Sequence, residues 1–142
     1  MHRGDVRAIE SSQALARTMR RLAVYGPGDP GARHELRAAY GPAALRITLM
    51  LQLFMTRMAD CATAPLLLAA PCCRCLSTHE RAMLGAVGAA ADGDWAAAHL
   101  ALGGLVRPDA STAAVAAAAG LAEALVDCGG PVPRRGPRPV IN

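Results

Sequence analysis

The sequence predicts an all-α protein: a single-domain bundle of about five to six helices around a central apolar helix at residues 43–61. Three observations favour this class. Hydrophobic residues make up 53% of the 142 positions, enough to bury a core in a chain about one domain long. Most of them are Ala, Leu and Val, and alanine is the best helix former. Aromatic residues, which favour strands, account for only 3%.

The N-terminal part of the chain predicts two helices separated by a turn. Over residues 5–24, Leu15, Met19 and Leu22 recur at helical spacing, and the Gly-Pro-Gly that follows ends the helix. A Gly-Asp-Pro-Gly turn leads into a shorter helix, which extends to about Tyr40 before a Gly-Pro pair.

The strongest core signal lies in the next helix, at about residues 43–61. Ile47, Leu51, Phe54 and Met58 fall on one stripe, and further apolar residues fill most of the remaining circumference. A helix that is apolar nearly all round is expected at the centre of a domain. Its most apolar run, residues 47–56, is too short to span a bilayer, so no membrane segment is expected.

The second half of the chain predicts three more helices. Residues 66–71 form either a buried extended segment or a short helix. Ser77 and Glu80 then have the spacing of a capping box, which predicts a helix over 78–91. A further helix is expected from about Trp95 to Val106.

An alanine-rich last helix is expected to end near Asp127, before a Gly-Gly-Pro stop. Residues 1–130 are therefore predicted to form the helical domain. Residues 131–142 are rich in proline and arginine and are predicted to be a disordered tail.

All fifteen basic side chains are arginines, and the net charge is +4. This charge is too small to indicate nucleic acid by itself. Arg17, Arg20 and Arg21 cluster on the first predicted helix, where they form either a solvated face or an anion-binding site. The expected partner is another protein or a second copy of the chain.

The feature that most suggests chemistry is the thiol cluster Cys72-Cys73-Arg74-Cys75, directly before the capping box. Zinc sites need three or four converging thiolates or imidazoles, and most iron–sulfur clusters need four thiolates. Cys72, Cys73 and Cys75 are candidate ligands for Zn or an Fe–S cluster. The side chains that could complete such a site are His79, Cys61 and Cys128.

Two other interpretations of the cysteines stay open. Thiols near a helix N-terminus and an arginine have a lowered pKa, so Cys72 could form a redox pair with either Cys73 or Cys75. Alternatively, the cysteines are structural and the protein is a helical interaction or adaptor module that uses the arginine cluster of the first helix or the basic tail. No catalytic triad or paired-carboxylate motif indicates an enzyme. The primary hypothesis is a non-enzymatic metal-binding protein.

The N-terminus is charged and polar, where a secretory signal would begin an apolar stretch. Five cysteines without such a signal are typical of reduced thiols, and a cytoplasmic location is expected.

Several segments together are similar to a known family. They are Met19-Arg20-Arg21-Leu22-Ala23, Ala70-Pro71-Cys72-Cys73 followed by Thr78 and Glu80, Ala98-His99-Leu100, and Gly129-Gly130-Pro131. Over residues 15–133 the chain resembles an uncharacterised family of small all-helical alphaproteobacterial proteins, especially of sphingomonads, with an Ala-Pro-Cys-Cys-rich segment before a capped acidic helix. The resemblance implies a helical cytosolic protein. This chain departs from the family pattern because Arg74 interrupts its three consecutive cysteines.

Overall fold

The computed structural model describes residues 3–135, and residues 1–2 and 136–142 lie outside the described range. Its helices are α1 (Arg3–Tyr25), α2 (Pro30–Tyr40), α3 (Ala44–Cys61), α4 (Thr78–Ala91), α5 (Trp95–Leu102) and α6 (Ser111–Asp127), with short 3₁₀ turns η1 (Gly41–Ala43) and η2 (Pro108–Ala110). The only β pairing among the described residues is an isolated bridge between Ala62 and Val106. The predicted all-α class is confirmed.

Local capping signals set several of the helix starts. Asp29 caps α2 by accepting a hydrogen bond from the Ala32 amide at 2.8 Å. At the start of α4, the Ser77 hydroxyl accepts from the Glu80 amide at 3.0 Å, and the Glu80 carboxylate accepts from the Ser77 amide at 2.8 Å. The predicted capping box is therefore present, and it aims Glu80 back towards the preceding loop.

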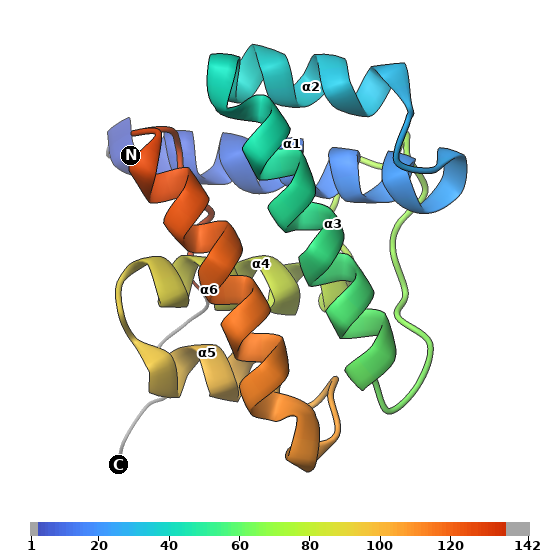
Figure 1. Ribbon diagram of the computed structural model, residues 1–142, viewed down its shortest axis with the longest axis vertical. Helices are drawn as coiled ribbons and strands as arrows, with labels where there is room; N and C mark the ends of the chain where they lie inside the picture. The colour runs from blue at the N-terminus through green and yellow to red at the C-terminus, as the bar shows by residue number, and fades with distance from the viewer. Residues whose placement is uncertain (1–2, 136–142) are drawn as a thin grey trace.

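The helices pack so that α3 lies beside α6, while α1 and α2 run across one end of that pair (Figure 1). Helix α4 packs against both α5 and α6. Ile47, Leu51, Phe54 and Met58 are each 0% exposed, which confirms the predicted core stripe of α3. The opposite side of α3 is not covered, although its apolar composition predicted a helix buried nearly all round.

Residues 108–127, which include α6, are long and apolar enough to cross a membrane by length and composition, with a mean hydropathy of 1.3. Half of the most apolar 18-residue stretch in this range is buried inside the protein. The buried side includes Val115, Ala118, Ala122 and Leu125. In this structure α6 is one side of the helical core, packed on α3 and α4.

The predicted start of the disordered tail at residue 131 needs correction. The Pro131 carbonyl accepts hydrogen bonds from Tyr40 and Ser11, each at 3.1 Å. Further along, Arg135 forms ion pairs with two carboxylates beyond the end of α4. Residues 131–135 therefore belong to the folded domain, and the rest of the predicted tail lies outside the described residues.

Candidate functional site

A buried ion pair joins α1 to α4. The Arg20 guanidinium donates to the two carboxylate oxygens of Glu80, with both N–O distances at 2.7 Å. The side chains are only 2% and 0% exposed. Burying two charges removes their hydration, and this loss is offset only when the charges are paired and their other hydrogen-bonding groups have partners. We call this pair the Arg20–Glu80 clamp.

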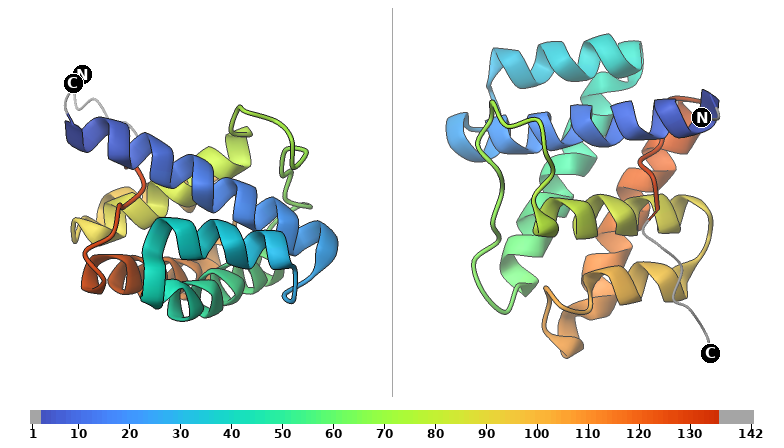
Figure 2. Two further views of the ribbon diagram at one scale, coloured as in Figure 1. Left: turned by 90° about the horizontal axis from the view of Figure 1, so that it is seen from above. Right: turned by 180° about the vertical axis from the view of Figure 1, so that it is seen from behind.

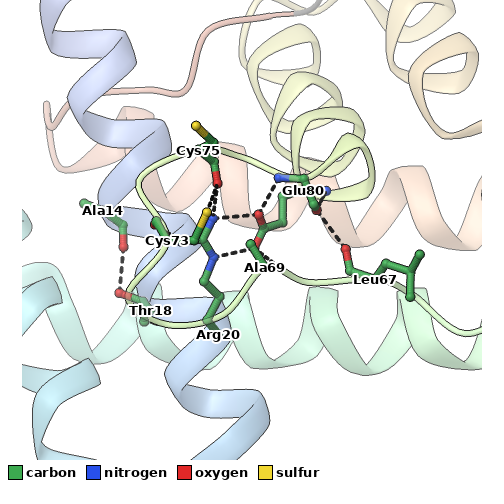
Figure 3. A network of polar contacts seen from close by, with 9 residues as sticks. Ala14, Thr18, Arg20, Leu67, Ala69, Cys73, Cys75 and Glu80 are labelled. Atoms are coloured by element: carbon green, nitrogen blue, oxygen red, sulfur yellow. Dashed lines mark hydrogen bonds and ion pairs between the residues drawn. The ribbon is translucent and has the colours of Figure 1, made fainter.

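The same clamp fixes the segment before α4, residues 66–77, which we call the cysteine loop. Arg20 also donates to the carbonyl oxygens of Cys73 at 2.6 Å and Cys75 at 2.9 Å. Glu80 in turn accepts from the Ala69 amide at 3.3 Å. Figure 3 shows the guanidinium reaching both carbonyls and the carboxylate. Arg20 therefore orders the backbone of the loop through hydrogen bonds to its carbonyl oxygens.

The clamp stays charged over a wide pH range. Burial raises the pKa of Glu80, but the hydrogen bonds from Arg20 and the Ser77 amide lower it more, so the net pKa lies below the ordinary 4.5. The hydrogen bond to Glu80 raises the pKa of Arg20 against the opposing effect of burial. Each partner thus favours the ionised form of the other.

The thiols of the loop face mostly outward. Cys72 and Cys75 are exposed and Cys73 is half-buried. The Cys73 thiol donates to the Cys75 carbonyl at 3.5 Å, and the Cys75 sulfur points away from the clamp (Figure 3). His79 is engaged elsewhere, because its Nδ1 accepts from the Leu67 amide at 2.8 Å.

The remaining predicted ligands lie in other parts of the protein. Cys61 is buried in the core at the end of α3, and Cys128 follows α6, where its thiol donates to the Leu125 carbonyl at 3.2 Å. Within residues 3–135, no group of three or more His, Cys, Asp or Glu side chains is placed to hold a metal ion. The six predicted ligands therefore do not form one site, because closeness in sequence did not make their side chains converge.

The three predicted anion-binding arginines each have a carboxylate partner within the chain. Arg20 forms the buried clamp, Arg17 donates to Glu35 at 2.8 Å, and Arg21 donates to Asp29 at 2.7 Å. The hydrogen bond from Arg21 lowers the pKa of Asp29 despite partial desolvation. The cluster therefore holds α1 to α2 and to the cysteine loop, and its members do not share one anion-binding surface.

A surface that sequence reasoning missed lies on the outer side of α3. Leu45, Leu49 and Leu53 follow one another at four-residue spacing and are 72%, 52% and 44% exposed. We call them the leucine stripe. Residues four apart lie on the same helix face, and this face points away from the buried stripe of α3. The four-residue spacing of these leucines could have indicated a second apolar face of the helix. Periodicity does not show, however, which apolar face contacts another helix.

Beside the leucine stripe, α2 and α3 enclose a hollow of about 440 Å³. Arg33 and Arg37 line it from α2, and Leu45 and Leu49 line it from α3. We call this hollow with the leucine stripe the α2–α3 groove. The other residues that line it are Pro27, Gly28, Ala44, Thr48 and Gln52. Both arginines are exposed, and neither forms an ion pair within the part of the chain that the structure describes.

A second hollow, of about 520 Å³, lies between α1, α3, α4 and the segment that follows α3. That segment runs outside the helices from the end of α3 up to α1 and back to α4 (Figure 2). Its Leu66 and Leu68 line the hollow together with Met19, Met55 and Met83. The other lining residues are alanines and a proline, so no polar side chain of residues 3–135 lines this apolar hollow.

Comparison with known proteins identifies no relative from which a function could be transferred. No protein-family model matches the chain, and neither the curated proteins nor the solved structures include a match.

Proposed function

We propose that this chain is a non-enzymatic helical interaction module that holds a helix of a partner protein in the α2–α3 groove. The observation that supports this proposal is the leucine stripe, three exposed leucines in register beside a hollow between two helices. Laying an apolar helix face into such a groove is a recurrent mode of peptide recognition.

The stripe has the energetics of a moderate binding surface. About half of each leucine side chain is exposed, so covering it would contribute on the order of 1 kcal/mol per leucine. Part of this gain is offset by the entropy lost on association. Further favourable contacts from the groove walls are needed for stable binding, and Gln52 supplies a polar side chain there.

The two thiol hypotheses have less geometric support. A metal site formed by Cys72, Cys73 and Cys75 lacks a converging set of ligands among the described residues. All five cysteines are free thiols in this structure, and the carbonyls of the loop, not its sulfurs, meet the charged group beneath it.

Site-specific photo-crosslinking tests the proposal in the cells that make this protein. A photoreactive residue replaces Leu49, and a matched control carries it at Ala116, an exposed position on α6. We expect a discrete adduct from position 49 that disappears when Leu45→Asp is added, because an aspartate in the stripe would be desolvated by the partner. Equal adducts at both positions, or none at position 49, would contradict the proposal.

The apolar hollow favours a second candidate function, the binding of an aliphatic chain. Its volume lies within the range of roughly 300–1,000 Å³ that is usual for small-molecule sites. A lining without polar side chains among the described residues offers little to replace the hydration of a polar ligand. Its three methionines are flexible and adapt to irregular apolar shapes.

Methionine-methyl NMR separates this candidate from non-specific binding. On titration with decanol, the methyl signals of Met19, Met55 and Met83 are expected to shift and saturate, while that of Met58, outside the hollow, stays in place. Filling the hollow with Ala59→Leu should abolish these shifts, whereas Ala116→Leu on α6 should preserve them. Uniform shifts of all the methionines would rule out a specific site.

A further inference from the structure

We infer that the α2–α3 groove selects an acidic amphipathic helix, with carboxylates on the flank that meets Arg33 and Arg37. The inference rests on the proposed function and adds the chemistry of the partner. It depends on the charged side chains that line the hollow beside the leucine stripe, which among the described residues are both arginines.

The charge of the groove is basic. Between residues 27 and 57 the chain has four arginines and two acidic residues, Asp29 and Glu35. Asp29 forms an ion pair with Arg21 of α1 at 2.7 Å. Glu35 accepts a hydrogen bond from Arg17 of α1, and Arg46 donates to Asp127, the last residue of α6, at 2.9 Å. The remaining anion of α3, at position 60, lies in its last turn, away from the residues that line the hollow. Arg33 and Arg37 thus face the groove without a carboxylate among the described residues.

The two arginines have a spacing that a helix can match. They stand four residues apart on α2, so their side chains lie one turn apart on the same face. Two carboxylates four residues apart on a partner helix would meet them in the same way. Guanidinium groups bind carboxylates in a bidentate geometry, which fixes register as well as attraction.

A second copy of this chain does not meet the same requirement. In a symmetric dimer through α3, the patch on each copy faces the equivalent patch on the other. The groove would then bring arginines towards arginines, and none of the described residues that line it is a carboxylate that could neutralise them. Like charges placed across an interface oppose the pairing.

An anionic membrane surface would also attract leucines and arginines. The groove argues against it, since Arg33 and Leu49 line the walls of a hollow of about 440 Å³ that a flat surface cannot enter. A helix fills such a hollow with side chains. The observations therefore favour a helical partner over a lipid surface.

A matched panel of helical peptides tests the inference with the whole chain. All peptides share one leucine face, and their flanks contain glutamate, glutamine or arginine at the same positions. Binding is followed by fluorescence anisotropy at low and high salt. We expect the glutamate peptide to bind about five- to tenfold more tightly than the glutamine peptide. Each of the two ion pairs at the rim of the groove should increase the affinity about two- to threefold, and these factors multiply. The arginine peptide should bind weakest, and high salt should reduce the differences.

Variants assign the effect to particular residues. The double variant R33A/R37A should bind the glutamate and glutamine peptides equally, whereas Arg81→Ala, an exposed arginine on α4, should leave the preference intact. Leu49→Asp should weaken all the peptides. Circular dichroism checks that each variant is folded, which is expected because all these positions are exposed.

Each alternative has its own outcome. Equal binding of the glutamate and glutamine peptides overturns the acidic preference and leaves the proposed function standing. Failure of every peptide also overturns the inference, and the crosslink at position 49 then decides the proposed function separately. Self-association that Leu49→Asp abolishes makes a second copy the occupant. Binding to vesicles of anionic phospholipid that is lost in the R33A/R37A variant would show that the groove binds a membrane surface.

Discussion

Removing Arg20 should destabilise this protein far more than removing its neighbour Arg17 from the same helix. Arg20 and Glu80 are 2% and 0% exposed, and deleting one partner of a buried pair costs about 3–5 kcal/mol because the other charge remains buried alone. Arg20→Met would in addition leave the Cys73 and Cys75 carbonyls without their donor. Arg17 pairs with Glu35 near the surface, where such pairs contribute at most about 1 kcal/mol.

Urea unfolding followed by circular dichroism measures both variants. Typical stabilities are about 5–15 kcal/mol, so the loss in Arg20→Met should lower the unfolding midpoint strongly. Arg17→Met should change it little. Similar small losses in the two variants would refute the idea that the Arg20–Glu80 clamp orders this part of the fold.

The pH dependence gives a sharper test of the same pair. In the native protein the pKa of Glu80 is lowered, so its ionisation contributes stability at pH values above 4.5 that is lost as the pH falls below that value. In Arg20→Met the carboxylate keeps its burial without its partner, which raises its pKa, so acid now relieves the buried charge. The stability gap between the two proteins should therefore narrow as the pH is lowered. A difference in unfolding free energy that stays constant with pH would contradict the conclusion that Arg20 keeps the buried Glu80 ionised.

Three further predictions concern other parts of the fold. Gly88→Ala would place a Cβ 2.5 Å from the Pro133 carbonyl oxygen and should lower the free energy of unfolding in urea by about 1–3 kcal/mol. In the control Gly120→Ala the nearest atom is 3.6 Å from the new Cβ, and helix propensity should raise the free energy of unfolding by up to about 1 kcal/mol. Burial raises the pKa of Tyr40 from 10.0 to about 12. The stability that comes from the neutral hydroxyl is therefore complete below pH 10.0 and is lost between pH 10.0 and about 12. Ultraviolet titration of tyrosinate absorbance measures the pKa, and Tyr40→Phe should remove this loss of stability. Exposed Cys75 should react rapidly with a thiol reagent, its replacement by Ser should change stability by less than about 0.5 kcal/mol, and a chelator should leave the melting temperature of the native protein unchanged.

Features encoded within a few residues could be predicted from the sequence. The capping box needs only Ser77 and Glu80 in one turn, and it is present with both of its hydrogen bonds. The buried stripe of α3 needs only helical periodicity, and Phe54 is 0% exposed as expected. Both features depend on spacing along one helix, which the sequence contains directly.

Features that depend on distant contacts could not be predicted in this way. Arg20 looked like part of a solvated cluster because its partner, Glu80, is 60 residues away in the chain. The tail boundary was misplaced because Gly88 leaves room for residues 133–135 to cross α4. The helix at residues 43–61 was expected to be buried nearly all round, because periodicity shows which residues share a face of a helix but not which faces contact other helices.

The cysteines illustrate the same limit for a site. Three thiols in four residues suggested a metal centre, but ligation needs side chains that point to one place. The loop carbonyls turn towards Arg20, and the Cys75 sulfur turns outward (Figure 3). The partner chemistry proposed for the α2–α3 groove came from the opposite kind of observation, side chains from two helices brought together by the fold.

Methyl NMR of the whole, leucine-labelled chain with the glutamate peptide tests most directly whether the functional surface is the α2–α3 groove. We expect saturable shifts of the Leu45, Leu49 and Leu53 methyl groups, while those of Leu67 in the cysteine loop and Leu100 on α5, both exposed, stay unchanged. Shifts centred on Leu67, with the leucine stripe unmoved, would place binding at the cysteine loop and contradict the assignment of function to the groove.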